Sequence, residues 1–158
     1  MISNEAYDKL ENHLPYQIDY TANFNKSFRR EHQLQYISSE LTADELAILF
    51  ILDFEPYLTQ SEIAKFLFKG KAHIGKILND MAERGFIKRI ADTKDNIIIK
   101  RNIITPKGLE IIKIGSKEGQ QIQAKMDEEF SEEDIKQFIS YLKRYRKVLS
   151  SIVDVKLK

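Results

Sequence analysis

The sequence predicts a mainly α-helical fold with one small β-hairpin, which places the protein in the α+β class. Two observations support this prediction. The segments "LTADELAILFIL" and "LTQSEIAKFL" each pair a threonine with a glutamate three residues later and continue into an apolar run, as capped helices do. The segments "FIKRIA" and "IIIKRNII" are rich in β-branched residues and flank "DTKDN", a cluster of turn formers, as in a hairpin.

The composition sets the broad class of protein. With 158 residues the chain is one domain, or a small domain with an appended helical part, and it has no cysteine, which excludes disulfides, thiolate metal sites and catalytic thiols. The N-terminal "MISNEAYDKLENH" lacks the apolar core of a signal peptide, and no apolar run approaches the roughly 20 residues of a membrane span. We therefore expect a cytoplasmic protein with no membrane contact.

Charge is unevenly distributed along the chain. The net charge is only +1, yet the stretch from Thr59 to Gly108 has 11 Lys or Arg against 5 Asp or Glu, a balance of +6, and the remainder has 14 against 19, a balance of −5. A local excess of positive charge favours nucleic acid as the partner of that stretch.

The first long helix is expected to begin near Pro15, because proline is favoured in the first helical turn. Its aromatic residues recur every four positions and so form one stripe. The stripe has two interpretations: a packed core, or the lining of a pocket for a small aromatic or phenolic effector. Its members are Tyr16, Tyr20, Phe24 and Phe28.

Three helices are predicted in the middle of the chain, near residues 43–54, 60–68 and 71–84. Gly70 permits a sharp turn between the second and the third, and Gly85 is placed as the C-cap of the third. Helix restarts at Thr105 and Pro106, as N-cap and first helical residue, and runs toward Phe130.

A last helix begins at Ser131 and carries apolar residues at alternating spacings of three and four, which is the seam of a helix that packs along its length. We expect this seam to contact a second copy of the chain; the alternative is packing against the first long helix. The seam residues are Ile135, Phe138, Leu142, Tyr145, Leu149 and Ile152.

Helix, tight turn, helix and hairpin follow one another in the order of a winged helix-turn-helix, whose second helix enters the DNA major groove. In "KAHIGKILNDMAER" the residues Ile74, Ile77, Leu78 and Met81 share one face, which we expect to be buried. The basic and small residues gather in the first half of the opposite face, the end that a recognition helix presents to base edges.

The charged residues of this helix and hairpin have two interpretations, a solvated surface or contact with DNA, and their position in the order of elements favours DNA. Lysine and arginine reach phosphates or guanine acceptors, histidine donates to guanine, asparagine bridges to phosphate or adenine, and glycine permits close approach of the backbone. The candidate DNA-binding residues are Lys69, Lys71, Ala72, His73, Gly75, Lys76, Asn79, Lys88, Arg89, Lys94, Asn96, Lys100 and Arg101.

Together, "LTADELAILFIL", "LTQSEIAKFL", "AHIGKILNDMAERGFIKR" and "ITPKG" resemble the MarR-type transcriptional regulators in order and spacing, over roughly residues 15–152. The resemblance implies a homodimeric DNA-binding regulator, a repressor rather than an activator, that binds a pseudo-palindromic operator and is released by a small ligand. It implies N-terminal helices over 1–40 that belong to the dimerisation region, a winged helix-turn-helix lobe over 41–104, and C-terminal dimerisation helices over 105–158.

The wing departs from the family pattern. MarR-type wings usually carry an Asp-Arg pair near the tip, whose arginine enters the minor groove, but here Asp95 is followed by Asn96 and the loop is about one residue longer. We expect Lys94, Lys100 or Arg101 to substitute for that arginine.

Catalysis is not indicated, because the sequence lacks a Gly-rich phosphate loop, a nucleophile elbow and a paired-histidine motif of metallohydrolases. We expect neither an enzyme nor a bound cofactor or metal. Two alternatives to the DNA-binding regulator remain at this point: a winged-helix module that binds a protein, and a metal-responsive regulator in which His13 or His32 acts with nearby carboxylates.

Overall fold

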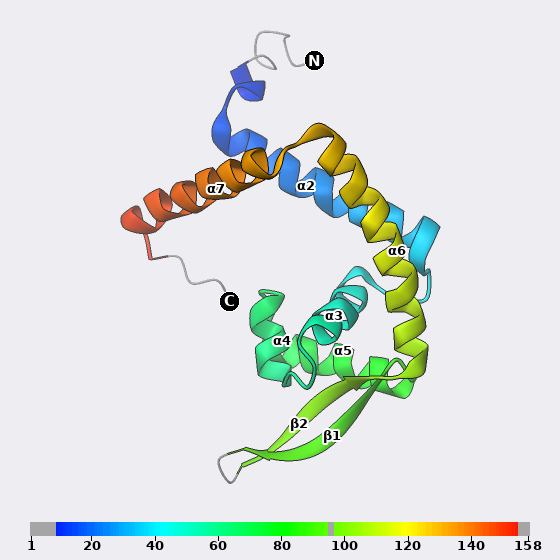
Figure 1. Cartoon of the computed structure of the whole chain (residues 1–158). Coiled ribbons are helices and arrows are strands. Elements are labelled where there is room, and N and C mark those ends of the chain that lie inside the picture. The colour runs from blue at the N-terminus through cyan, green and yellow to red at the C-terminus, as the bar shows by residue number, and fades with distance from the viewer. Residues whose placement is uncertain (1–8, 95–96, 155–158) are drawn as a thin grey trace, which may run out of the picture. The chain divides into compact units, whose positions relative to one another are not determined.

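A computed structural model describes residues 9–94 and 97–154 of the chain. The chain divides into two compact units, Met1–Ala43 and Asp44–Lys158. Figure 1 shows the order of their helices and strands. The division falls close to the boundary that we expect at residue 40, and the helices after residue 105 share the second unit with the winged-helix lobe.

The first unit contains helix α2 (Leu14–His32), which has Pro15 in its first turn as predicted. It continues directly into one π-helical turn, η1 (Gln33–Ile37), which the sequence pattern did not indicate. Within this unit the side-chain amide of Gln33 donates to the carbonyl of Leu41. The rings of Tyr16 and Tyr20 stack with their centroids 6.0 Å apart.

The second unit opens with the three predicted helices, α3 (Ala43–Phe54), α4 (Gln60–Phe66) and α5 (Lys71–Glu83). The capping box of α4 is present: the carboxylate of Glu62 accepts from the backbone N–H of Thr59 at 2.7 Å. Helix α4 ends two residues earlier than predicted, because Phe68 adopts a left-handed backbone with φ of 51°. Gly85, also left-handed with φ of 79°, follows α5 as expected.

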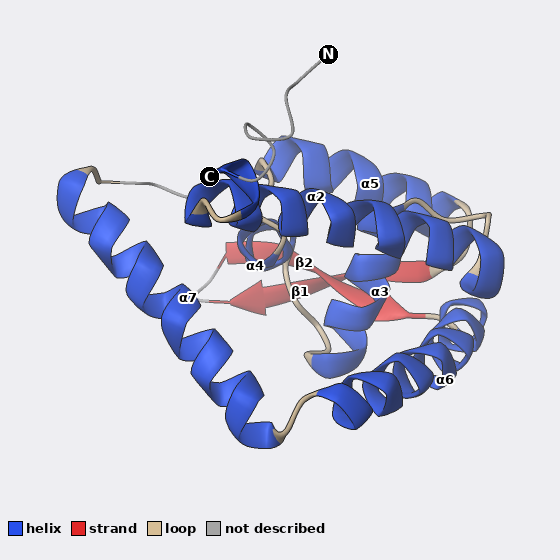
Figure 2. Ribbon diagram, turned by 90° about the horizontal axis from the view of Figure 1, so that it is seen from above, coloured by secondary structure: helices blue, strands red, loops and turns tan. Residues whose placement is uncertain are grey.

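The hairpin pairs β1 (Ile87–Lys94) with β2 (Ile97–Ile104) in antiparallel register, with Arg89 opposite Asn102. Figure 2 shows the two strands in red. A single antiparallel bridge joins Thr59 to Arg101, so the segment before α4 is fastened to the outer side of β2.

The core of this lobe comes from the face of α5 predicted to be buried together with residues of α3, α4 and the start of the hairpin. Ile74, Leu78 and Met81 are fully buried, and Ile77 is half-buried. The other side chains buried to 2 % exposure or less are Ile48, Leu49, Leu52, Ile63, Phe86, Ile87 and Asn102.

Helix α6 (Pro106–Glu129) is anchored to the lobe at its N-terminus. The hydroxyl of Thr105 lies 2.6 Å from the carbonyl oxygen of Gly85 and 3.0 Å from that of Phe86, and it accepts from the N–H of Gly108. A Cβ at Gly108 would lie 2.5 Å from the Phe86 carbonyl oxygen, so only glycine permits this close approach of helix and hairpin.

Helix α7 (Glu132–Ile152) follows a capping box in which Ser131 and Asp134 bond to each other's backbone N–H. The hydrogen bonds from Ser131 lower the pKa of the Asp134 carboxyl. No residue of α7 is buried, and its seam includes side chains that are largely exposed, such as Phe138 at 57 % and Ile152 at 73 %.

Candidate nucleic-acid interface

The first two turns of α5 present exposed positive charge. Lys71, Ala72 and Lys76 are exposed, and within the part of the chain that the structure describes the lysine side chains have no hydrogen bond or ion pair. The free backbone N–H groups and the helix dipole add partial positive charge at the same end. This surface suits a phosphate or the acceptor edge of a base.

Two other cations of this region are held by an acidic side chain. Asp44, in the first turn of α3, lies 3.0 Å from Lys69 Nζ and 3.7 Å from His73 Nε2. All three side chains remain partly exposed, so these ion pairs are exchangeable. Contact of Lys69 or His73 with DNA would therefore compete with Asp44.

Gly75 differs from its expected place at the DNA-facing surface. It is buried, and a Cβ built on it would lie 2.9 Å from Cδ of Gln60 and still closer to Nε2. The close approach that glycine permits is thus made by a side chain of α4. Asn79 is exposed as expected, but its Oδ1 accepts a hydrogen bond from Arg89.

Both arginines of the hairpin are bound within the lobe. Arg89 donates to Asn79 and to Gln60, and burial of its side chain lowers the pKa of the guanidinium. Arg101 donates to the Asp92 carboxylate and, at 2.9 Å, to the Tyr57 carbonyl. The hydrogen bond from Arg101 lowers the pKa of Asp92. Both predicted DNA-binding arginines therefore engage acceptors of their own chain.

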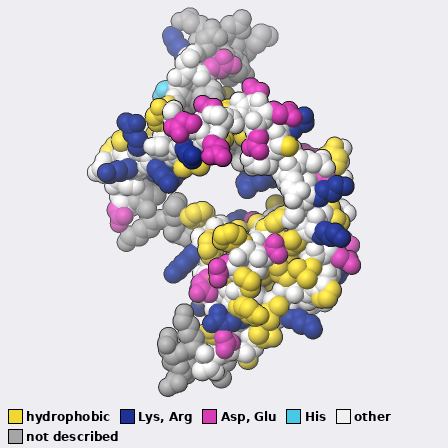
Figure 3. All heavy atoms as spheres, in the orientation of Figure 1, with side chains coloured by type: hydrophobic (Ala, Val, Ile, Leu, Met, Phe, Trp, Pro, Cys, Tyr) yellow, Lys and Arg dark blue, Asp and Glu magenta, His cyan; other side chains and the backbone are white. Residues whose placement is uncertain are grey.

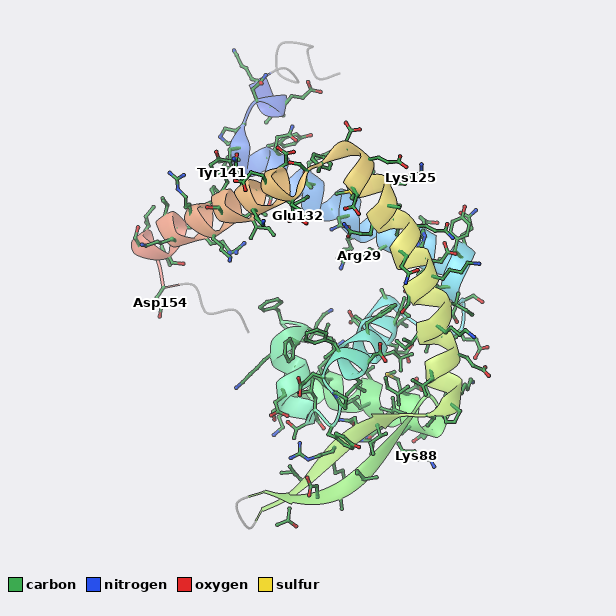
Figure 4. The ribbon with its side chains drawn as sticks, viewed as in Figure 1. Arg29, Lys88, Lys125, Glu132, Tyr141 and Asp154 are labelled. Carbon is green, nitrogen blue, oxygen red and sulfur yellow. The ribbon has the colours of Figure 1, made fainter. Side chains whose placement is uncertain are left out.

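Lys88 and Lys100 are the exposed cations of the hairpin for which the structure describes the side chain. The strand register puts Lys88 opposite Ile103 and Lys100 opposite Ala91, so the two lysines lie on opposite faces of the hairpin. Figure 4 shows Lys88 projecting outward at the base of the hairpin. The side chain of Lys94, and Asn96 altogether, lie outside the described residues.

The acidic side of α5 near its C-terminus is neutralised by Arg84. Its guanidinium lies 2.7 Å from the buried carboxylate of Glu45 and 2.8 Å from Asp80. The hydrogen bond between Arg84 and Asp80 lowers the pKa of Asp80 and raises that of Arg84. Negative charge at this end of the helix is therefore partly compensated, although Glu83 remains exposed.

The remaining predicted residues lie outside the lobe surface. Tyr20, Phe24 and Phe28 on α2 are 56 %, 62 % and 41 % exposed, and Tyr16 is half-buried. The seam of α7 borders a groove of about 370 Å³ at its junction with α6, lined by Met126, Phe130, Asp134, Ile135, Gln137, Phe138 and Tyr141. Figure 3 shows hydrophobic side chains, in yellow, on the face of the molecule toward the viewer.

Sequence reasoning missed three residues that shape this surface: Asp44, Gln60 and Asp92. For Arg89, strand alternation was an available signal: it stands two residues after the buried Ile87 and so lies on the same inward face of the hairpin. In residues 9–94 and 97–154 no three His, Asp or Glu side chains gather in a group that could hold a metal ion. None of the helices there is long and apolar enough to cross a membrane.

The order α3, α4, α5, β1, β2, with a buried inner face on α5, defines a winged helix-turn-helix. Residues 41–96 match the model of the MarR family, the same family that the sequence motifs resemble. No curated protein sequence matches the chain.

Solved structures share the fold over most of the chain. MepR of Staphylococcus aureus, in complex with DNA, is 20 % identical with a TM-score of 0.73, over 88 % of this chain and 98 % of that one. A MarR/EmrR family transcriptional regulator of Acinetobacter sp. ADP1 is 19 % identical with a TM-score of 0.72, over 90 % and 98 %. PcaV of Streptomyces coelicolor, in complex with its natural ligand, is 18 % identical with a TM-score of 0.65, over 87 % and 94 %.

Proposed function

We propose that the protein is a transcriptional regulator that binds double-stranded DNA through the first two turns of α5. The observation that carries the proposal is a pair of exposed lysines, Lys71 and Lys76, that have no side-chain partner among residues 9–94 and 97–154. They lie at the end of the recognition helix that meets base edges. The surrounding segment has a balance of +6, and MepR, which shares the fold, is seen in complex with DNA.

The regulator acts as a homodimer on a pseudo-palindromic operator. The seam of α7 supplies apolar side chains for contact with a second copy, and a twofold dimer would present two α5 helices about one turn of the duplex apart. Repression by occlusion of a promoter follows from this mode of binding. A small aromatic or phenolic effector contacting the stripe on α2 would weaken operator binding. This part of the proposal is supported by PcaV, which shares the fold and is seen in complex with its natural ligand.

The test is a fluorescence-anisotropy titration of promoter DNA from the protein's own transcription unit. Binding should weaken steeply with salt, with a log-log slope of about −0.9 for each phosphate neutralised. Lys76→Ala should weaken binding roughly tenfold and flatten the slope by about 1. Lys117→Ala, which removes an exposed lysine from α6, is the matched control and should change neither quantity.

A winged-helix module that binds a protein is the second candidate, and exposed aromatic residues favour it. Phe54 is 88 % exposed, and Tyr57, Phe66 and Phe68 are 51 %, 57 % and 62 % exposed around α4. The titration separates the two functions. A protein module would show no salt-dependent affinity for duplex DNA, and its binding would not depend on Lys76.

A further inference from the structure

Gln60 occupies the first turn of α4, and its side-chain amide links that helix to two other elements. Its Nε2 donates to the carbonyl of Lys71 at 2.8 Å, at the start of α5. Its Oε1 accepts from Nη2 of Arg89 at 3.1 Å, on strand β1. Gln60 therefore joins the recognition helix to the wing through Arg89, and Asn79, which accepts from the same arginine, joins them directly.

Gly75 makes room for this amide. The gap between α4 and α5 at this position is filled by the end of the Gln60 side chain, and alanine at position 75 would displace it. Glycine is a less favourable helix residue than alanine, so helix formation alone favours the larger side chain. The residues at positions 60 and 75 are therefore matched to each other.

The inward face of the hairpin carries two polar side chains near its base, next to the buried Ile87. Arg89 is half-buried, and Asn102, its register partner on β2, is fully buried and donates to the Leu58 carbonyl at 2.7 Å. Buried polar groups that lose their partners are costly. Among the described residues Nε of Arg89 and Oδ1 of Asn102 are buried without a hydrogen-bond partner, so a shifted wing would add the loss of the bonds that these side chains do make.

We propose that Gln60, with Gly75 beside it, is a positioning residue that fixes the wing against α5, and that Arg89 acts through this network and not on phosphate. The proposal rests on the proposed function of DNA binding. A duplex must be met by the recognition helix and the wing together, so fixing their relative position in advance lowers the ordering cost of binding.

A double-mutant cycle tests the proposal: Gln60→Ala, Gly75→Ala, the double variant and the wild type, each titrated with promoter DNA and each melted without DNA. We expect either single change to weaken binding about tenfold, and the double change to weaken it no further, because both remove the same contact. The melting temperature of Gly75→Ala should stay level or rise, because alanine favours helix. Gly75→Ala would then weaken DNA binding without lowering the melting temperature. A merely structural role would lower both.

Several results overturn the proposal. If Gly75 serves close approach of the DNA, Gly75→Ala will cost the same factor with or without Gln60. If neither single change alters affinity, Gln60 positions nothing. If the wild type binds no DNA, the proposed function fails as well, and hydrogen exchange of the β1 amides in the free protein then shows whether Gln60 holds the wing: unchanged exchange in Gln60→Ala refutes that too.

Arg89 provides a second arm. Lysine keeps the charge but cannot donate to Asn79 and Gln60 together as the guanidinium does. A positioning role predicts that Arg89→Lys weakens binding as much as Arg89→Ala and speeds exchange of the β1 amides. A phosphate contact predicts that Arg89→Lys keeps most of the affinity, which would contradict the proposal. Lys88→Ala, on the adjacent exposed residue, is the control and should leave amide exchange unchanged.

Discussion

On α5 the side chains of Lys71 and Lys76 reach solvent without a partner in the described part of the chain, whereas on the hairpin Arg89 and Arg101 are bound to acceptors of their own lobe. Both regions are basic in sequence, so composition does not separate them. The difference is one of geometry: the lysines stand on the outer face of an amphipathic helix, while the arginines bridge between elements. The positive charge of Lys71 and Lys76 is therefore available to a ligand, whereas that of Arg89 and Arg101 stabilises the fold.

The largest effect is expected from removing both free lysines. Lys71→Ala combined with Lys76→Ala should weaken promoter binding roughly 100-fold, at about 1.4 kcal/mol for each tenfold step. The melting temperature should not fall, since neither side chain has a partner to lose in the part of the chain that the structure describes. Anisotropy titration and thermal melting measure the two quantities on the same samples. A drop in melting temperature that matches the loss of affinity would erase the distinction between the two regions.

Arg101→Ala, in the hairpin, should lower stability more than DNA affinity, the reverse of the lysine changes. It removes hydrogen bonds to Asp92 and to the Tyr57 carbonyl, and we expect the free energy of unfolding to fall by roughly 1–2 kcal/mol, because the arginine side chain is partly exposed. DNA affinity should fall only a few-fold. Urea unfolding measures the first effect. Unchanged stability with a large loss of affinity would instead show that Arg101 contacts DNA.

The Asp92 pair should also show in the pH dependence of stability. Hydrogen bonding from Arg101 holds the pKa of Asp92 below its usual value of 3.8, so its contribution is present above pH 3.8 and is lost as the pH falls through the lower folded-state pKa. The stability difference between wild type and Asp92→Asn should therefore shrink below that pH. Urea unfolding at pH 7 and at low pH compares them, and a difference that grows in acid would contradict this assignment.

The smallest effect is expected from Asp44→Asn, which releases Lys69 and His73 from their ion pairs. Both side chains would then be free to approach DNA, and promoter affinity at low salt should rise about two- to fivefold, with a steeper salt dependence. Asp53→Asn, an exposed acid at the other end of α3, is the matched control. Equal increases in the two variants would indicate only a general change of charge.

Much of the fold could be predicted from local patterns. The bounds of α3, α5 and α6 follow from cap residues, apolar periodicity and glycine, all of which act within a few positions. The hairpin was predicted with too long a turn, because β1 continues through Asp92 and Thr93 to Lys94. The early end of α4 and the π-helical turn could not be predicted, because tertiary contacts decide them. Phe68 in a left-handed conformation has no sequence signal, since glycine is the usual residue there.

The candidate site was predictable where a single helix decides it and unpredictable where separate elements meet. The outward position of Lys71 and Lys76 follows from the period of α5 alone. The contact between Gln60 and Gly75 joins positions on two helices, and that between Arg101 and the Tyr57 carbonyl spans 44 residues. No pattern in the sequence fixes such distances, so the hydrogen-bond partners of the two arginines required the structure.

The most direct test of the central claim uses the absence of cysteine from the chain. A single cysteine introduced as Ala72→Cys, on the exposed start of α5, can carry an iron–EDTA group that cleaves nearby DNA. The account predicts cleavage confined to two positions, one in the major groove of each half-site, and none from the same group attached at Lys117→Cys on α6. Diffuse cleavage, or equal cleavage from both attachment points, would contradict the entry of α5 into the groove.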